Sequence, residues 1–321
     1  MGARPVVAPP GGPLAAALAA VEAASTSPAT ARRLADQVRG DRRAGAEARS
    51  VADRGLGLAS MALGDHVAAV HHLRRAVRGA EHGGLPDRAI EARTSLVFAL
   101  TGTGRLTAAL AEANQAAKLA RGPAAAAVQA QRATVLTRLG RYDEALAGYD
   151  RAVTSFVRAG DAFAEARVRS NRGVLRAYRG NWEGASADLG RAEALHRAAG
   201  RQVAAAGVVH NRGFLLALRG DVPAALSCFD TAASQYRAHG ADPGLLLVDR
   251  AELLLSVHLV GEALAVAAAA VADYSRRRMG ANLAEARLAL ARAATLAGDH
   301  EVARTSAAQA RRDFRRQGRE G

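Results

Sequence analysis

Two segments of the chain repeat one another forty residues apart, and this repetition constrains the fold more than any other feature. The segment "NRGVLRAYRGN" begins at Asn171, and "NRGFLLALRGD" begins at Asn211. A separation of this size is too long for one helix and too short for a domain, so it indicates a unit that stacks on copies of itself. The sequence therefore predicts a repeat protein in which each unit buries its apolar face on its neighbours.

The repeat is phased by a glycine that is followed by an alanine five residues later and another alanine twelve residues later. Gly220 with Ala225 and Ala232 is one example. Because glycine adopts the left-handed backbone that ends a helix at little cost, each such position predicts a turn between two helices. The seven positions that fit the rule, one of them a histidine, are Gly64, Gly104, Gly140, Gly180, Gly220, His258 and Gly298.

Small side chains at a fixed distance before each turn predict a close crossing of the two helices. A bulky residue at such a crossing would push the backbones apart. The composition agrees, because half of the residues are hydrophobic but only 4% are aromatic, which favours closely packed helices. The residues seven positions before the turns are Gly57, Val97, Ala133, Gly173, Gly213, Ala251 and Ala291.

These offsets resemble those of the tetratricopeptide repeat, a helix-turn-helix unit with a large apolar or aromatic residue between its two alanines. The resemblance implies an all-α, TPR-like α-solenoid of about seven helix-turn-helix units, a right-handed superhelix whose first helices line a concave groove. Three units have alanine at the large position (Ala113, Ala267 and Ala307), so we expect them to pack more weakly. The other units have Leu73, Tyr149, Leu189 and Phe229 there.

The repeat array is predicted to occupy residues 13–317. Within it, residues 13–40 resemble a shortened helical pair whose second helix opens at Ser27 and Pro28. Residues 1–12 are predicted to be a disordered tail and residues 318–321 a C-terminal tail. No uninterrupted apolar stretch is long enough to span a bilayer. Since the one cysteine, Cys228, permits no internal disulfide, we expect a cytoplasmic protein that does not enter a membrane.

The formal net charge of +14 is carried by arginines that are spread through every repeat beside Glu and Asp. A surface that binds nucleic acid usually gathers its cations on one face or interleaves them with aromatic residues. The charge pattern therefore argues against nucleic acid as the partner.

The sequence offers no credible catalytic or metal-binding set. The "NRG" segments and "GRYDEALAGYDRAV" at 140–153 are similar to the helical arm that precedes the peptidase domain of bacterial, caspase-like CHAT-domain proteins. Such a peptidase would need a histidine beside a nucleophilic cysteine. The His-Gly pairs at 82–83 and 239–240 fall in linkers between repeats, whereas Cys228 lies on a packing face. We expect no enzyme activity, no metal and no cofactor.

Two adjacent columns of polar residues precede the turns and are the candidate peptide-binding residues. Asparagine at the first column's offset is similar to residues that hold a peptide backbone or a terminal carboxylate in this family. The arginines of the second column could face a ligand or tie one repeat to the next, and the sequence leaves both alternatives open. The columns are Gln131, Asn171, Asn211 and Asp249, nine residues before the turn, and Arg132, Arg172, Arg212 and Arg250, eight residues before it.

The sequence thus predicts a non-catalytic scaffold that binds a protein or peptide partner, as an extended or acidic segment, in its groove. Two alternatives remain. The chain could be the arm of a CHAT-type peptidase whose catalytic domain is missing or separate, or it could be the sensor module of a transcriptional regulator.

Overall fold

The computed structural model describes residues 12–241, 243, 245–276 and 280–317, and this part of the chain contains sixteen α-helices and no strand. The predicted all-α fold is therefore confirmed. The tails predicted at 1–12 and 318–321 lie outside the described residues, apart from Gly12, which begins the first helix. The chain divides into two compact units, residues 1–135 with 316–321 and residues 136–315, and each is described by itself.

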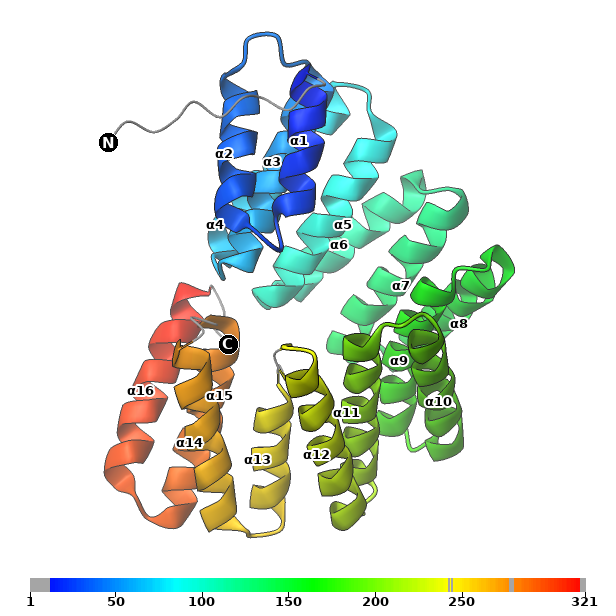
Figure 1. Cartoon of the computed structure of the whole chain (residues 1–321). Coiled ribbons are helices and arrows are strands. Elements are labelled where there is room, and N and C mark those ends of the chain that lie inside the picture. Colours follow the sequence, from blue (N-terminus) through cyan, green and yellow to red (C-terminus); the bar gives the residue numbers. More distant parts are fainter. Residues whose placement is uncertain (1–11, 242, 244, 277–279, 318–321) are drawn as a thin grey trace. The chain divides into compact units, whose positions relative to one another are not determined.

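The N-terminal unit consists of helices that pack as antiparallel pairs (Figure 1). The last helix of this series continues past the boundary at residue 135. The helices are α1 (Gly12–Ala23), α2 (Pro28–Gly40), α3 (Ala46–Ala62), α4 (His66–His82), α5 (Pro86–Gly102), α6 (Leu106–Leu119) and α7 (Gly122–Arg138).

The C-terminal unit repeats the same pattern, and each of the seven predicted turns falls between two helices that follow one another in the chain. Its first helix, α8, follows the turn at Gly140. The helices are α8 (Tyr142–Ala159), α9 (Ala162–Tyr178), α10 (Trp182–Ala198), α11 (Gln202–Leu218), α12 (Val222–Ala238), α13 (Leu246–Ser256), α14 (Val260–Arg276), α15 (Gly280–Ala297) and α16 (His300–Arg316).

The turn residues have the left-handed backbone that the sequence predicts. The six turn glycines have φ between +72° and +81°. His258, which replaces glycine in the sixth unit, has φ of +60° and is the only non-glycine residue with a positive φ in the described part of the chain. The repeat phase therefore imposes this conformation even on a residue that adopts it at a cost.

The paired helices cross as closely as the small residues predict. A Cβ atom added to Gly213 of α11 would lie 2.7 Å from Cδ1 of Phe229 on α12, and one added to Gly57 would lie 2.5 Å from Cγ of Leu73. Both distances are too short for two carbon atoms. The glycine seven residues before the turn thus makes room for the large residue nine after it.

The second unit has alanine at the large position and a larger residue at the small one. Val97 stands where three other units have glycine, and Ala113 stands where others have a large residue; both are 1% exposed. In the sixth unit, Ala251 and Ala267 are both small, and they share a buried cluster with Ala289. The expectation that such units pack more weakly stays a prediction.

The shortened first pair is present, with Pro28 at the start of α2. The Ser27 hydroxyl donates to Oγ1 of Thr30 at 2.8 Å and does not cap the helix. Helix α1 packs so closely on α3 that a Cβ on Gly55 would lie 3.2 Å from Cβ of Ala20. Helices α1 and α2 therefore cover the side of α3 that no preceding repeat covers.

The first helices of successive repeats also contact one another. Each of the two compact units therefore has a layer of first helices beside a layer of second helices. These contacts join α3 with α5 in the N-terminal unit, and α9 with α11, α11 with α13 and α13 with α15 in the C-terminal unit. Among the described helices, none has an apolar stretch long enough to cross a membrane.

Candidate functional site

The predicted arginine column points at the second helix of the preceding hairpin. Nε of Arg132 donates to Oδ1 of Asn114 at 2.7 Å, and Arg250 pairs with Asp230. Both acceptors lie ten residues after the turn glycine of the hairpin before, at Gly104 and Gly220. For Arg212 the equivalent offset is occupied by Gly190, which has no side chain. Arg212 instead pairs with Glu193, three residues further along the same helix.

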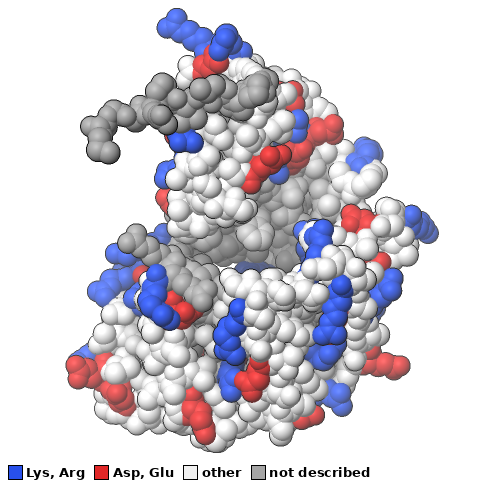
Figure 2. Space-filling view, in the orientation of Figure 1, with Lys and Arg blue, Asp and Glu red and all other residues white. Residues whose placement is uncertain are grey.

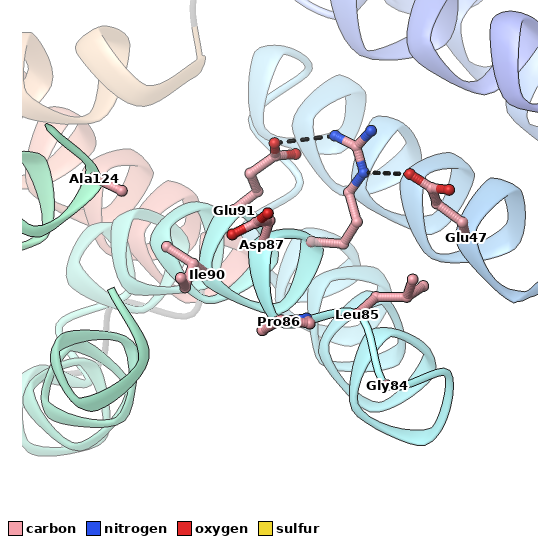
Figure 3. Close-up of a pocket in the computed structure, with 9 residues that line it drawn as sticks. Glu47, Gly84, Leu85, Pro86, Asp87, Ile90, Glu91 and Ala124 are labelled. Atoms are coloured by element: carbon pink, nitrogen blue, oxygen red, sulfur yellow. Dashed lines mark hydrogen bonds and ion pairs between the residues drawn. The ribbon is translucent and has the colours of Figure 1, made fainter. Parts of the chain in front are cut away.

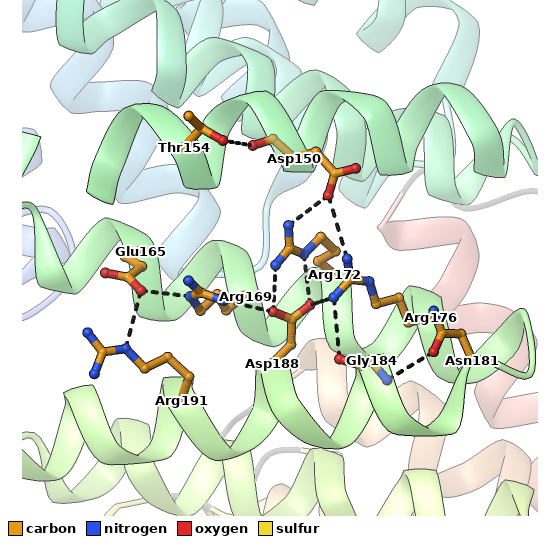
Figure 4. A network of polar contacts seen from close by, with 10 residues as sticks. All are labelled: Asp150, Thr154, Glu165, Arg169, Arg172, Arg176, Asn181, Gly184, Asp188 and Arg191. Carbon is orange, nitrogen blue, oxygen red and sulfur yellow. Dashed lines mark hydrogen bonds and ion pairs between the residues drawn. The ribbon is translucent and has the colours of Figure 1, made fainter. Parts of the chain in front are cut away.

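Arg172 is the most deeply buried member of this column and joins three helices (Figure 4). It is 7% exposed. Its Nε and Nη2 donate to the two oxygens of Asp188 on α10 at 2.7 and 2.6 Å, and its Nη1 donates to Asp150 on α8 at 2.7 Å. Burial disfavours the charged guanidinium, but the hydrogen bonds and charges of Asp188 and Asp150 outweigh it and raise the pKa of Arg172.

Asp188 accepts hydrogen bonds from three guanidinium groups on one stripe of α9. Besides Arg172, Arg169 donates at 3.1 Å and Arg176 at 2.8 Å, and the carboxylate is 1% exposed. Figure 4 shows these side chains converging from α9 on the α10 residue. A carboxylate that is buried this fully needs such partners, and the cluster fastens α8, α9 and α10 together.

The amide column forms hydrogen bonds between successive first helices. Nε2 of Gln131 donates to the Thr94 carbonyl at 2.7 Å, and Nδ2 of Asn211 donates to Oγ of Ser170 at 2.9 Å. Asp249 forms the third link, with Oδ2 2.7 Å from Nε2 of His210. For these residues and the four arginines, the contacts favour the alternative in which the columns tie one repeat to the next.

Asn171 differs from the other column residues. Its side chain is exposed, and no described residue forms a hydrogen bond with it. The Asn211 amide uses its nitrogen on Ser170, which leaves its oxygen open to a ligand. The two asparagines occupy equivalent positions of α9 and α11, one repeat apart, and Asn171 is exposed whereas Asn211 is half-buried.

The structure shows further candidate residues that the sequence analysis did not name. They lie along the same stripe of α9 and α11 as the asparagines and are mostly apolar or aromatic. We give the name first-helix face to one stripe of exposed and half-buried residues on α9 and the equivalent stripe on α11. Tyr178 is 57% exposed and its ring centroid lies 5.4 Å from that of Phe214. A recurrence at forty residues could have revealed the set, which is Phe163, Arg167, Asn171, Val174 and Tyr178 on α9 and Val203, Gly207, Asn211, Phe214 and Leu218 on α11.

At the N-terminal end of the first-helix face, Phe163 is surrounded by cations. The guanidinium carbon of Arg201 lies 3.9 Å from the centre of the Phe163 ring, and that of Arg167 lies 5.9 Å from it. The His196 ring meets the same aromatic edge-on at 6.1 Å. Cation–π contacts of this kind hold the guanidinium groups in place without neutralising them.

No protein-family model matches the chain, and no curated protein matches it by sequence. Solved structures do match. A Rap protein complexed with competence and sporulation factor is 14% identical, with a TM-score of 0.68 over 89% of this chain and 80% of the other.

Two further structures extend this likeness. NprR in complex with its cognate peptide NprX is 15% identical, with a TM-score of 0.58 over 75% of this chain and 72% of the other. A tetratricopeptide repeat protein from Parabacteroides merdae is 17% identical, with a TM-score of 0.51 over 82% of this chain and 94% of that one. The chain has a TPR-like α-solenoid fold. At these identities the likeness establishes the fold alone.

The cysteine and the two histidines that the sequence analysis considered for a peptidase lie on, or directly after, second helices of this TPR-like array. Cys228 is half-buried on α12, and burial raises the pKa of its thiol, which keeps the sulfur protonated and poorly nucleophilic. His239 follows α12 and lies in the linker, as predicted, whereas His82 is the last residue of α4 and only its glycine, Gly83, lies in the linker.

The N-terminal unit of the TPR-like array has a pocket of about 510 Å³ beside the start of α5 (Figure 3). Glu47, Asp87 and Glu91 contribute carboxylates to it, and Leu85 and Ile90 contribute apolar surface. Arg88 crosses the pocket wall and donates to Glu47 at 2.9 Å and to Glu91 at 3.0 Å. The pocket's own ion pairs thus satisfy two of its three carboxylates.

The surface charges are mixed and do not form one basic area on the face in view. Figure 2 shows Lys and Arg side chains interspersed with Asp and Glu. Many arginines are bound to carboxylates, as Arg54 is to Glu91 at 3.0 Å. Ion pairs within the array therefore compensate part of the positive charge of the arginines.

Proposed function

We propose that the chain binds an extended peptide segment of a protein partner on the first-helix face of α9 and α11, without catalysing a reaction. The observation that carries the proposal is the open amide of Asn171, exposed among apolar side chains and without a hydrogen bond from any described residue. An amide can donate to and accept from a peptide backbone at the same time. Asn211 supplies a second open oxygen one repeat away.

The rest of the first-helix face suits the side chains of such a peptide. Val174, Tyr178, Phe214 and Leu218 offer apolar and aromatic surface beside the asparagines, and Tyr178 and Leu218 are 57% and 41% exposed. Apolar contacts supply most of the free energy of peptide binding, and a few polar groups fix the peptide's position. The face combines both features.

The eight candidate residues divide into two roles under this proposal. Asn171 and Asn211 contact the peptide. The other six hold the first helices in register, since each already pairs with a neighbouring helix. They are Gln131, Arg132, Arg172, Arg212, Asp249 and Arg250.

The comparisons support a peptide ligand without identifying it. NprR is described in complex with a cognate peptide, and the Rap protein in complex with competence and sporulation factor. These are properties of those proteins. They support the proposal because they indicate that a TPR-like fold can accommodate a peptide.

The test uses a pool of random octapeptides, each with an N-terminal fluorescein, passed over the immobilised full chain. Enriched peptides are then resynthesised and their Kd measured by fluorescence anisotropy. The double substitution Asn171→Ala and Asn211→Ala should raise the Kd by about ten- to thirtyfold, because two backbone hydrogen bonds at about 1 kcal/mol each are lost. Gln309→Ala, an amide on the second helix α16, should leave the Kd unchanged.

Melting curves accompany the affinity measurement. The double variant should lose only about 1 kcal/mol of stability, because Asn171 has no side-chain hydrogen bond to lose and Asn211 has one, to Ser170. The proposal fails if no octapeptide is enriched over the bare matrix, or if the double variant binds the enriched peptides as tightly as the original chain does.

Two alternatives from the sequence keep their place as proposals. The array could serve a separately encoded CHAT-type peptidase as its arm, and a gene neighbour with paired histidine and cysteine would favour this. The array could also be the sensor of a transcriptional regulator, in which case its peptide would alter retention of that regulator on DNA. A cytoplasmic location fits each of these.

A further inference from the structure

Two guanidinium groups at one end of the first-helix face lack a counter-ion. Arg167 and Arg201 are exposed, and each is positioned over the Phe163 ring, at 5.9 and 3.9 Å from its centre. Neither forms an ion pair with a carboxylate of the described residues. This sets them apart from the arginines of the column, which are all bound to neighbouring helices.

The carboxylates closest to this cluster in sequence are already used. Asp161 caps α9 and accepts a hydrogen bond from the Ala164 amide at 2.9 Å. Glu165 is buried and pairs with Arg169 at 2.7 Å and with Arg191 at 3.4 Å. Neither of these two carboxylates forms an ion pair with Arg167 or Arg201.

The start of α11 strengthens the positive potential of these two arginines. Arg201 occupies the position before the helix, where Asp161 stands at the start of α9, and it makes no side-chain cap. A helix N-terminus carries a partial positive charge and free amide hydrogens, so a cation there is unfavourable unless an anion is present. Arginine also precedes α6 and α8, as Arg105 and Arg141, and Arg201 is distinguished from them by its contact with an aromatic ring.

A buried histidine lies behind the aromatic ring. His196 is 5% exposed, its ring packs edge-on against Phe163, and its Nδ1 has no hydrogen-bond partner. Burial, together with the charge of Arg201, lowers the pKa of His196 and keeps it neutral. It adds a polar atom to the cluster but no charge that could satisfy the arginines.

We propose that Arg167 and Arg201 bind a carboxylate of the peptide, supplied by an acidic side chain or by its C-terminus. This inference rests on the proposed function. Guanidinium groups bind carboxylates through directed, charge-assisted hydrogen bonds, and the Phe163 ring holds both groups in place beforehand. The aromatic pair of Tyr178 and Phe214 then receives an apolar side chain of the same peptide.

The separation of the two ends requires an extended ligand. Arg167 and Tyr178 are eleven residues apart on α9, which corresponds to about 16 Å along the helix at 1.5 Å per residue. A single amino acid cannot bridge this distance, whereas an extended segment can. The ligand is therefore predicted to carry its carboxylate and its apolar side chain several residues apart.

Two fluorescein-labelled octapeptide pools test this. The first has free C-termini and includes Asp and Glu; the second omits both residues and is C-terminally amidated. The original chain should retain peptides from the first pool at least about tenfold more strongly, and raising the salt concentration should reduce the difference. The double variant Arg167→Gln and Arg201→Gln should lose this preference.

The matched control is Arg158→Gln with Arg237→Gln, which removes the same charge from the last turns of α8 and α12. It should keep the preference. A preference that survives Arg167→Gln with Arg201→Gln, or that disappears equally in the control, overturns the inference. If both pools bind equally and Asn171→Ala with Asn211→Ala abolishes that binding, the inference fails but the proposed function stands. If neither pool binds, both fail.

Discussion

At the scale of single residues, the same residue type serves two purposes in this chain, and its partners decide which. The column arginines and the pair at Phe163 look alike in sequence. Arg172 is buried between Asp188 and Asp150, whereas Arg201 lies on an aromatic ring with no acid beside it. The repeat offsets predicted the column but left its role open, because the acceptors lie on other helices, which for Arg172 are α8 and α10.

Replacing Arg172 tests the structural role at this scale. Arg172→Ala should destabilise the chain by about 2–4 kcal/mol, because Asp188 would lose two hydrogen bonds in a buried site, although Arg169 and Arg176 would still contact it. Urea unfolding followed by circular dichroism measures this. Arg179→Ala is the control, since Arg179 and its partner Asp143 are both exposed and the pair contributes little. Equal midpoints for the two variants would contradict the assignment.

At the scale of helices, the sequence predicted much more. The seven turns within the hairpins followed from the repeat phase, including the one at His258, because a left-handed residue and two small residues at fixed offsets are local requirements of a helical hairpin. The close crossing followed from the same residues. The sequence did not predict the pairing between hairpins. This pairing depends on which side chains meet when their residues are separated by about twenty positions in the sequence.

Two glycine substitutions separate a packing requirement from a local preference at this scale. Gly213→Ala should destabilise the chain by about 1–3 kcal/mol, because the added Cβ would lie 2.7 Å from the Phe229 ring. Gly190→Ala on α10 meets nothing within 4 Å and should stabilise it by about 0.5–1 kcal/mol through helix propensity. Thermal unfolding of the two variants should thus shift in opposite directions. A gain in melting temperature for Gly213→Ala would mean that the crossing is looser than described.

At the scale of the whole molecule, the sequence predicted the fold, and it predicted only part of the face that we propose to bind a peptide. The repeat period and the offsets specified an all-α array, and the comparisons with solved structures agree. Asn171 and Asn211 were found because they recur. Phe163, Tyr178 and Phe214 were not, because an aromatic residue in a helical pattern indicates core packing until its exposure is known.

The most direct test of the central proposal is photo-cross-linking of a bound peptide. A benzophenone amino acid replaces Val174 on the first-helix face in one variant and Val157, an exposed residue of the second helix α8, in another. After irradiation with an enriched octapeptide, mass spectrometry should find the peptide attached at position 174 and not at position 157. Cross-linking at 157 alone, or equally at both positions, would contradict binding on the first-helix face.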